Sequence, residues 1–142
     1  MLVKQISVFV ENKPGRMAAI LDVLAQNNID ISALSIADTT DFGVLRIIVS
    51  DAALAKKVLN ESGVVVKTTD VIAVSMQDRP GGLAEILNVI NDGETTIEYM
   101  YAFVGRGKNG AMVVIKANHP ERAIKLLEDA GFRTADSANI FG

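Results

Sequence analysis

Two short loops of the sequence combine residue types that could bind a small anion. They read N-K-P-G-R-M at residues 12–17 and D-R-P-G-G-L at residues 78–83. Each loop has a polar residue, a base and Pro-Gly ahead of apolar residues at helical spacing. The N–H groups of a first helical turn have no partner within the helix and lie at the positive end of its dipole, so they attract a carboxylate or a phosphate. The spacing therefore predicts an anion site at each loop, with a plain strand-to-helix turn as the alternative.

The Pro-Gly pair at the centre of each loop has a specific place in this prediction. Pro14 and Pro80 suit the first position of a helix, where the missing N–H costs nothing. Gly15 and Gly81 allow a ligand to approach the backbone closely. The helix after the second loop should present one apolar face, formed by Leu83, Ile86, Leu87 and Ile90.

The loops recur because the chain contains an internal repeat. A shift of 66 positions aligns residues 8–31 with residues 74–97, and 8 of these 24 pairs are identical. Self-similarity of this kind indicates a duplicated structural unit. We therefore expect two domains, residues 1–69 and residues 70–142. Units this small bury a limited fraction of their surface, so we expect them to pack on each other.

Each repeat is predicted to contain a strand, a helix, two strands, a helix and a final strand. In the first repeat we expect strands over 3–10, 29–37, 44–50 and from 64, with helices over 14–26 and from Asp51 through 62. In the second we expect strands over 71–76, 96–104, 111–117 and from 132, with helices over 80–91 and 120–130. This βαββαβ order predicts an α+β fold of two ferredoxin-like repeats, each with both helices on one face of an antiparallel sheet.

Several residues mark the ends of the predicted helices. Asp51 can cap a helix through its side chain, and Gly63 and Gly131 can each end one in the left-handed conformation. Asn118 and Glu121 have the spacing of a capping box.

The second strand of each repeat is apolar on both faces. Within 96–104 one face carries Tyr99, Tyr101 and Phe103, and the other carries Met100, Ala102 and Val104. In the matching strand of the first repeat, Leu34 and Ile36 oppose Ala33 and Ala37. The two helices of each repeat cover one face of its sheet and leave none for the other face. The second apolar face therefore predicts that the repeats meet around these strands or that the chain forms a homodimer there.

Composition excludes several classes of function. The chain has no cysteine, which rules out disulfides and thiolate chemistry. Its net charge is −3 and no basic stripe is present, which argues against a nucleic-acid partner. No apolar run is long enough to span a membrane, and the N-terminus lacks the features of a signal peptide. We therefore expect a cytoplasmic protein.

The two loops, placed after the first strand of a βαββαβ unit, resemble those of the ACT domain, a small regulatory module that binds amino acids. The resemblance covers nearly all 142 residues, so the chain looks like a stand-alone tandem ACT protein. It implies a non-catalytic, allosteric protein that binds a free amino acid where two ACT units meet and modulates a partner enzyme. No cofactor is implied.

The resemblance also implies which residues bind the ligand. Backbone N–H groups at the loop and the helix start would hold the carboxylate, and polar residues two before the Pro and at the opening of the second strand would hold the rest. The positions that match are Asn12, Gly15, Arg16, Met17 and Asp30 in the first repeat and Asp78, Gly81, Gly82, Leu83 and Thr96 in the second. Gly82 replaces Arg16, which should give the second loop more room and make it the better pocket. Val10 and Met76 stand where some family members have histidine, so the preferred amino acid stays open.

Other functions remain as alternatives to an amino-acid sensor. Stand-alone tandem ACT proteins can accompany CoA-ligase-type enzymes, so an enzyme of this type is a candidate partner. The chain could instead be an assembly module whose ACT pockets are vestigial. An RNA-recognition motif shares the βαββαβ plan but needs aromatic residues on its first and third strands, which 71–76 and 111–117 lack. An acylphosphatase needs a catalytic Arg and Asn in an anion-binding loop, and neither loop has that sequence.

Three further signals are interpreted as structural. Residues 105–110, GRGKNG, match a dinucleotide-binding pattern, but a β-rich run follows where a helix is required, so we expect a hairpin turn. The DFG at 41–43 lacks every other kinase motif and is predicted to be a turn. His119, the only histidine, adjoins a proline at a helix start and is expected to cap the helix or lie on the surface. The carboxylates lack metal-ligand spacing, so no metal site is predicted.

Overall fold

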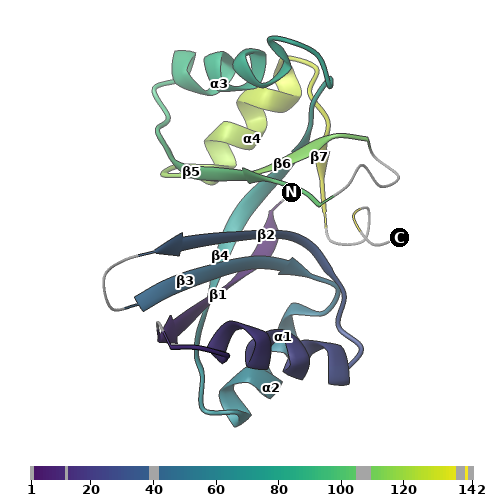
Figure 1. The fold of residues 1–142 in the computed structure, drawn as a ribbon. Helices are drawn as coiled ribbons and strands as arrows, with labels where there is room; N and C mark the ends of the chain where they lie inside the picture. Colours follow the sequence, from purple (N-terminus) through teal and green to yellow (C-terminus); the bar gives the residue numbers. More distant parts are fainter. Residues whose placement is uncertain (1, 12, 39–41, 105–109, 137–139, 141–142) are drawn as a thin grey trace. The chain divides into compact units, whose positions relative to one another are not determined.

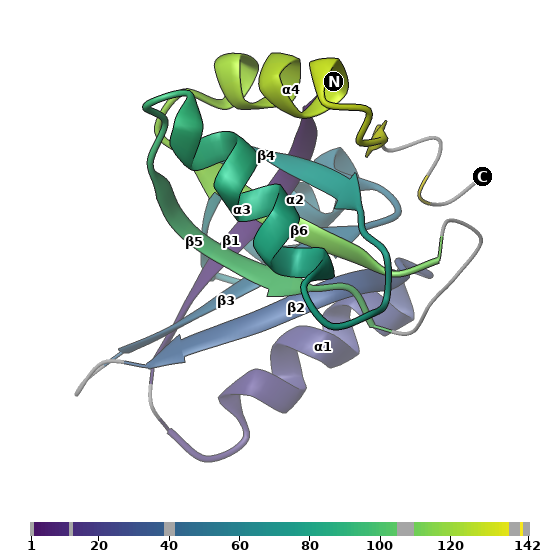
Figure 2. The same cartoon turned by 90° about the horizontal axis from the view of Figure 1, so that it is seen from above.

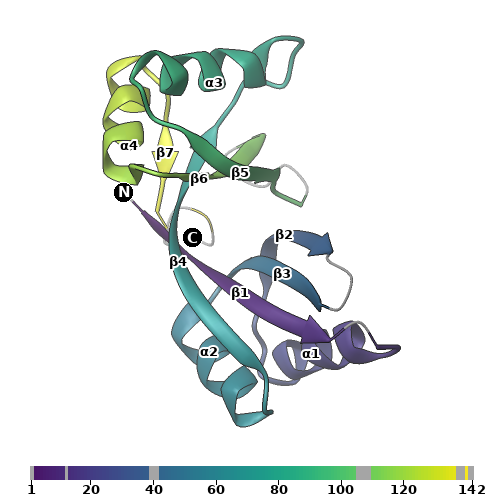
Figure 3. The same ribbon diagram turned by 90° about the vertical axis from the view of Figure 1, so that its left-hand side faces the viewer.

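The chain forms two compact units in the computed structural model, which describes residues 2–11, 13–38, 42–104, 110–136 and 140. One unit is Lys4–Thr69, and the other is Asp70–Gly142 together with Met1–Val3. Strand β4 (Val65–Ser75) contributes residues to both units and is continuous, as Figure 3 shows.

The first unit contains two helices and an antiparallel sheet. Its elements are β1 (Val3–Glu11), α1 (Arg16–Gln26), β2 (Ile31–Asp38), β3 (Phe42–Val49), α2 (Ala52–Glu61) and the start of β4. The strands lie in the order β2, β3, β1, β4, so that β2 is an edge strand. Both helices lie on the same face of this sheet (Figure 1).

The second unit repeats the same plan. Its elements are the end of β4, α3 (Gly82–Asp92), β5 (Ile97–Ala102), β6 (Met112–Ala117), α4 (Pro120–Asp129) and β7 (Thr134–Ala135). Strand β4 pairs with both β6 and β7, and β5 is the edge strand beyond β6. Figure 2 shows α3 running across the strands of this unit. The prediction of two ferredoxin-like α+β repeats is confirmed.

Each unit has its own apolar core between its helices and its sheet. In the first unit the fully buried members include Ile6, Val8, Leu24, Ile47 and Leu59. In the second they include Ile72, Val74, Ile86, Ile90, Ile115 and Leu127. Alternate residues of β1, β3, β4 and β6 supply the sheet side of these cores, as expected for strands with one face against helices.

The duplication extends to irregular backbone features. The pairing of β2 and of β5 shifts register at equivalent places, between Ile31 and Ala33 and between Ile97 and Tyr99. After each first helix of a unit, a residue other than glycine has a positive φ: 56° at Asn28 and 61° at Glu94. Such backbone conformations are uncommon, so their repetition shows that the two units share detailed geometry as well as topology.

The predicted caps of α2 are confirmed. The N–H of Leu54 donates a hydrogen bond to Asp51 Oδ1 over 3.0 Å, and Gly63 follows the helix with φ at 82°. The capping box predicted for α4 is wrong. His119 is the exposed N-cap residue of α4 and makes no side-chain cap bond, while Asn118 Oδ1 accepts a bond from the N–H of Thr96 over 2.8 Å. That contact with the start of β5 uses the amide oxygen that the capping box would need.

The strand faces agree with the predicted alternation. Tyr99 and Tyr101 pair with Lys116 and Val114, whereas Met100 pairs with the core residue Ile115. In β2, Leu34 and Ile36 pair with Ile47 and Leu45 and therefore lie on the helix side of the sheet, yet they are 42% and 54% exposed because β2 is the edge strand. The expectation that these strands form a contact between repeats or protomers stays a prediction.

The two turns predicted at 41–43 and 105–110 have different outcomes. Phe42 and Gly43 do not form a turn, because they pair with Glu11 and Val10 as the start of β3. The predicted hairpin at 105–110 lies almost wholly outside the described residues. No helix among the described residues is long and apolar enough to cross a membrane.

Candidate functional site

The two Pro-Gly loops form the same turn at the entrance to α1 and to α3. The N–H of Arg16 donates to the carbonyl of Lys13 over 3.3 Å, and the N–H of Gly82 donates to that of Arg79 over 2.9 Å. The glycine before each helix has a positive φ, 81° at Gly15 and 87° at Gly81. Proline followed by a glycine of positive φ, closed by a bond from the first to the fourth residue, is a type II turn.

This turn corrects the predicted place of the prolines. Pro14 and Pro80 lie before the N-cap residues Gly15 and Gly81, and the helices begin at Arg16 and Gly82. The prolines therefore preset the turn and are not the first helical residues. The glycines are required because a side chain is strained at a positive φ.

Backbone donors are exposed at the start of each helix. Neither N-cap glycine offers a side-chain cap. Among the described residues, no backbone carbonyl accepts a hydrogen bond from the N–H of Leu83 or Ala84, nor from that of Met17 or Ala18. These two pairs of N–H groups sit at the positive ends of the α3 and α1 dipoles, where an anion is favoured.

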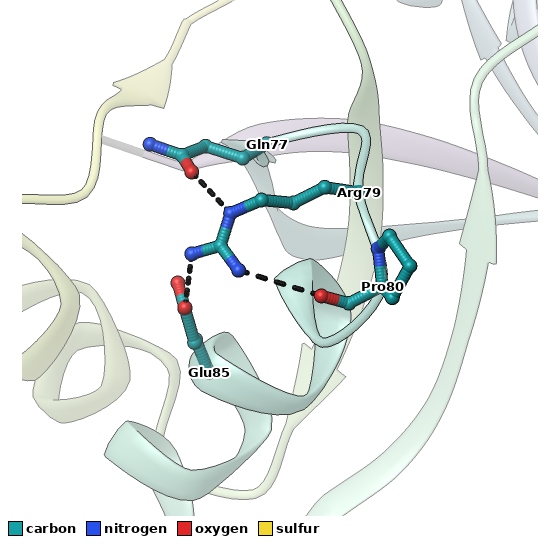
Figure 4. A network of polar contacts seen from close by, with 4 residues as sticks. All are labelled: Gln77, Arg79, Pro80 and Glu85. Atoms are coloured by element: carbon teal, nitrogen blue, oxygen red, sulfur yellow. Dashed lines mark hydrogen bonds and ion pairs between the residues drawn. The ribbon is translucent and has the colours of Figure 1, made fainter.

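In the second loop the only cation is committed to bracing the turn (Figure 4). Arg79 Nε donates to Gln77 Oε1 over 2.6 Å, Nη1 donates to the Pro80 carbonyl over 3.4 Å, and Nη2 forms an ion pair with Glu85. Three contacts from one guanidinium tie the segment after β4 to the first turn of α3. The neighbouring Asp78 is exposed and carries the loop's carboxylate.

The first loop carries more positive charge. Lys13 Nζ lies 3.0 Å from Glu11 Oε2, and Arg16 adds a second cation at the first residue of α1. The hydrogen-bonded Lys13 ammonium and, more weakly, the Arg16 guanidinium hold the pKa of the Glu11 carboxyl below its usual value. Glu11 therefore stays ionised near neutral pH. Asn12, the predicted polar residue of this loop, lies outside the described residues.

Gly82 does not give the second loop extra room for a ligand. It is buried, and a Cβ atom built on it would lie 2.0 Å from the backbone carbonyl oxygen of Gln77. The missing side chain is thus required by the packing of the chain itself. Gly81 is the open position, since a Cβ there would meet only Arg79 Nη1, at 4.0 Å. The half-buried Leu83 and Met17 follow in the first turns of α3 and α1.

The two predicted strand openings also share one geometry. The N–H of Asp30 donates to Ser50 Oγ over 2.9 Å while the N–H of Ser50 donates to the Asp30 carbonyl over 2.9 Å. Thr96 and Asn118 form the equivalent reciprocal pair in the second unit, over 2.8 and 3.0 Å. The exposed side chains of Asp30 and Thr96 are therefore held on a fixed backbone at the start of β2 and β5.

Within one unit the loop and the strand opening lie at opposite ends of the sheet. Glu11 pairs with Phe42 and Ile31 pairs with Val49, which is seven residues further along β3. At a rise of about 3.3 Å per residue these ends are about 23 Å apart. A single amino acid cannot touch both the loop and the strand opening of the same unit. Any ligand held by a loop and a strand opening must therefore contact the loop of one unit and the strand opening of a different unit.

A hollow of about 440 Å³ adjoins the opening of β5. Its lining comes from the end of α3 and the segment that follows: Leu87, Asn88, Asn91, Glu94, Thr95, Thr96 and Ile97. Thr95 is 4% exposed, and its hydroxyl oxygen has no hydrogen-bond partner among the described residues. The equivalent position of the first unit holds the buried Ile29. A threonine therefore occupies a core position at the floor of this polar hollow.

Replacing Thr95 with valine is expected to raise the free energy of unfolding by about 1 kcal/mol, because it removes a buried hydroxyl without a partner and keeps the side-chain shape. Thr134→Val is the control, since the Thr134 hydroxyl donates to Glu128 Oε1 over 3.0 Å. That change should bring no gain. Urea unfolding of the three proteins measures both effects, and equal stability of Thr95→Val and the parent would contradict the expectation.

Among the residues that the structure describes, no group of three or more acidic or histidine side chains could hold a metal ion. The geometry supplies backbone donors for one carboxylate at each loop and, in the second loop, the exposed carboxylate of Asp78. This arrangement suits a small zwitterion.

The sequence and the fold were compared with those of known proteins. A family model described as an ACT domain pair matches residues 1–140. A crystal structure of a Bacteroides thetaiotaomicron protein is 39% identical, covers 99% of this chain and 96% of its own, and superposes with a TM-score of 0.92. No curated protein matches the sequence.

More distant structures share the fold alone. The ligand-free regulatory subunit of aspartate kinase from Thermus thermophilus is 17% identical, with a TM-score of 0.63 over 90% of this chain and 91% of its own. The corresponding subunit from Thermus flavus is also 17% identical, with a TM-score of 0.59 over 89% and 91%.

Proposed function

Since this chain belongs to the family of ACT domain pairs, we propose that it is a regulatory protein without catalytic activity of its own that binds a free amino acid. One observation carries the proposal. Two equivalent loops each present, behind a glycine of positive φ, two N–H groups at a helix start that have no backbone partner among the described residues. This is a duplicated receptor for a single carboxylate.

The second loop is the proposed binding site. The N–H groups of Leu83 and Ala84 would receive the ligand's carboxylate, and Asp78 would receive its ammonium group. Arg79 does not compete for the carboxylate, because Gln77, Pro80 and Glu85 already engage its guanidinium. Gly81 leaves open space beside the backbone donors.

The remaining predicted residues have secondary places in this proposal. In the first unit the corresponding groups are Asn12, Gly15, Arg16 and Met17, at a more cationic loop. Thr96 and Asp30 would contact a ligand held by the loop of another unit, because their own loops lie at the far end of the sheet. The polar hollow beside Thr96 offers space for part of such a ligand.

Amino-acid binding is proposed to alter a partner enzyme. If the binding site differs between two packings of the units, ligand binding shifts the equilibrium between these two packings. A partner enzyme that is sensitive to the packing would then respond. The aspartate kinase subunits that share this fold are named as regulatory subunits, which supports a separate enzyme as the partner. A CoA-ligase-type enzyme is our candidate.

Calorimetric titration with each of the twenty amino acids, and with ATP and NAD, tests the proposal. We expect at least one amino acid to bind and neither nucleotide to do so, because each loop has donors for one carboxylate and the sequence lacks the Walker motif G-x-x-x-x-G-K-(S/T), whose Lys-Ser/Thr pair binds polyphosphates. Binding of a nucleotide alone would overturn the proposal. Binding of nothing would favour the alternative function, an assembly module with vestigial pockets.

The chain is also proposed to form a homodimer, because apolar side chains on the helix side of edge strand β2 are exposed. Ile36→Glu should then give a monomer by light scattering at high protein concentration. Val104→Glu, which alters an exposed apolar residue after β5, is the matched change. A monomer from Val104→Glu alone would place the contact on the second unit, and a monomeric parent protein would refute the dimer.

A further inference from the structure

The first residues of the chain belong to the second unit, although most of the strand that follows them belongs to the first. Residues 1–3 group with the second unit, and the first unit starts at Lys4. Leu2 is half-buried and packs against the apolar core of the second unit, and Val3 is 1% exposed. Strand β1 runs from Val3 to Glu11 without a break. One strand therefore begins in one unit and ends in the other.

Strand β7, the last strand of the second unit, is short. It has two residues, and its pairing with β4 covers Ala73 and Val74. Strand β6 pairs with β4 over residues 72–75, so β7 uses the opposite edge of β4. Strand β1 is the other neighbour of β4 in the sheet order, so β1 and β7 share that edge. The N-terminal strand thus lies along an edge that the final strand covers for two residues.

Leu2 also borders a hollow of about 440 Å³ at the start of α4. The other lining residues are Asp70 and residues 118–122, and most of them are polar. A side chain that is buried on one side contributes less to stability than a fully buried one, because less apolar area leaves water. Contacts of this kind open locally while the rest of a protein stays folded. The contact of Leu2 with the second core is therefore a place where the structure can open.

The far end of β1 leads directly into the first Pro-Gly loop. Ile6 and Val8 of this strand are buried in the first core. The N–H of Lys13 donates to the Glu11 carbonyl over 2.8 Å, so the loop follows the strand without a spacer. An extended strand rises about 3.3 Å per residue, and the nine residues of β1 span about 30 Å. The first core holds most of this length, and Leu2 holds the start.

We propose that Leu2 and β1 form a strap that opens and closes as one piece. Release of Leu2 from the second core loosens β1 from the first core, and loosening of β1 frees Leu2. The strap thereby couples the first Pro-Gly loop to the stability of the second unit. The proposal concerns the free protein and does not depend on amino-acid binding.

The first test weakens the attachment of Leu2 in the whole chain. Leu2→Ala should raise amide hydrogen exchange in both β1 and α4 about tenfold, the equivalent of about 1.4 kcal/mol, because it favours the open strap. Leu54→Ala is the matched control, since Leu54 is also half-buried but packs against the first core. It should leave exchange in α4 unchanged. Exchange followed by NMR for each residue reports both units at once.

The second test loosens β1 itself. Ile6→Val removes one methylene group from a β1 residue of the first core, and Ile29→Val makes the same change in that core just before β2, which β3 separates from β1. Each change should raise exchange within the first unit about two- to tenfold. Ile6→Val alone should also raise exchange in α4, because Ile6 lies on the strap. Both changes are small enough that the variants should fold.

Three outcomes would overturn the proposal. If Leu2→Ala leaves exchange in β1 unchanged, β1 does not open together with Leu2. If Ile6→Val and Ile29→Val raise exchange in α4 equally, the coupling passes through the first core as a whole or along β4, and the strap has no special part in it. If neither changes exchange in α4, the second unit opens independently of β1.

Discussion

Replacing Gly82 with alanine should lower the free energy of unfolding by about 2–3 kcal/mol, as overpacking of a closed site does. The new Cβ would lie 2.0 Å from the Gln77 carbonyl oxygen and 3.1 Å from its carbonyl carbon. Both obstacles are backbone atoms, so no side-chain rotation can relieve the contact. The turn that ends in the hydrogen bond from Gly82 to Arg79 would have to open. Chemical unfolding of the variant measures the loss directly.

Two variants serve as controls for this prediction. Arg16→Ala alters the equivalent exposed position of the first unit and should change stability by less than about 0.5 kcal/mol. At Gly93 a Cβ would lie 2.1 Å from Leu126 Cδ1, which belongs to a side chain that can rotate, so Gly93→Ala should cost less than Gly82→Ala. If Gly82→Ala were as stable as the parent, the second loop would be far more pliable than its hydrogen bonds suggest.

The fold was predictable because its determinants are local and occur twice. These determinants are the helical spacing after each loop, the alternation in the strands, and helix-capping residues such as Asp51 and Gly63. Each of them depends only on residues a few positions away. Repetition of the pattern at a fixed shift confirmed the order of elements without knowledge of any long-range contact. The element ends differ from the predictions by only a few residues for the same reason.

The errors arise where contacts distant in sequence decide. Asn118 has the spacing of a helix cap, but its amide oxygen accepts a bond from Thr96, 22 residues earlier. Gly82 suggested an open pocket, whereas the space beside it is filled by the carbonyl of Gln77. In the first Pro-Gly loop, the N–H of Arg16 donates to the Lys13 carbonyl and closes a turn, so the helix does not begin at the proline. Sequence preferences alone do not decide between this turn and an earlier helix start.

The candidate site was predictable in part. The Pro-Gly motif identified the two helix starts, and the strand order places loop and strand opening at opposite ends of each sheet. A cavity in the first unit was not predictable, because four segments between Phe9 and Val65 line it and only the tertiary fold brings these segments together.

Asp78→Ala should weaken binding of the amino acid at the second loop by about ten- to a hundredfold. The carboxylate would bind the ligand's ammonium group, and a charge-assisted hydrogen bond of this kind contributes about 1.5–3 kcal/mol. Asp78 is exposed, so its loss should leave the melting temperature of the free protein nearly unchanged. Asp78→Asn should have an intermediate effect, because it keeps an acceptor and removes the charge. Calorimetric dissociation constants for the three proteins measure the series.

The matched comparison is Asn12→Ala at the first loop, which should leave this binding intact. Ligand at 100 times its dissociation constant should stabilise the native protein by about 2.7 kcal/mol, and Asp78→Ala should lose most of that thermal shift at the same ligand concentration. Gly81→Val is unsuitable as a further test, because φ at this residue is 87° and a side chain would strain the turn whether or not a ligand binds. If Asp78→Ala keeps the full shift while Asn12→Ala abolishes it, the amino acid binds at the first loop, where the Lys13 and Arg16 charges replace the open backbone of the second.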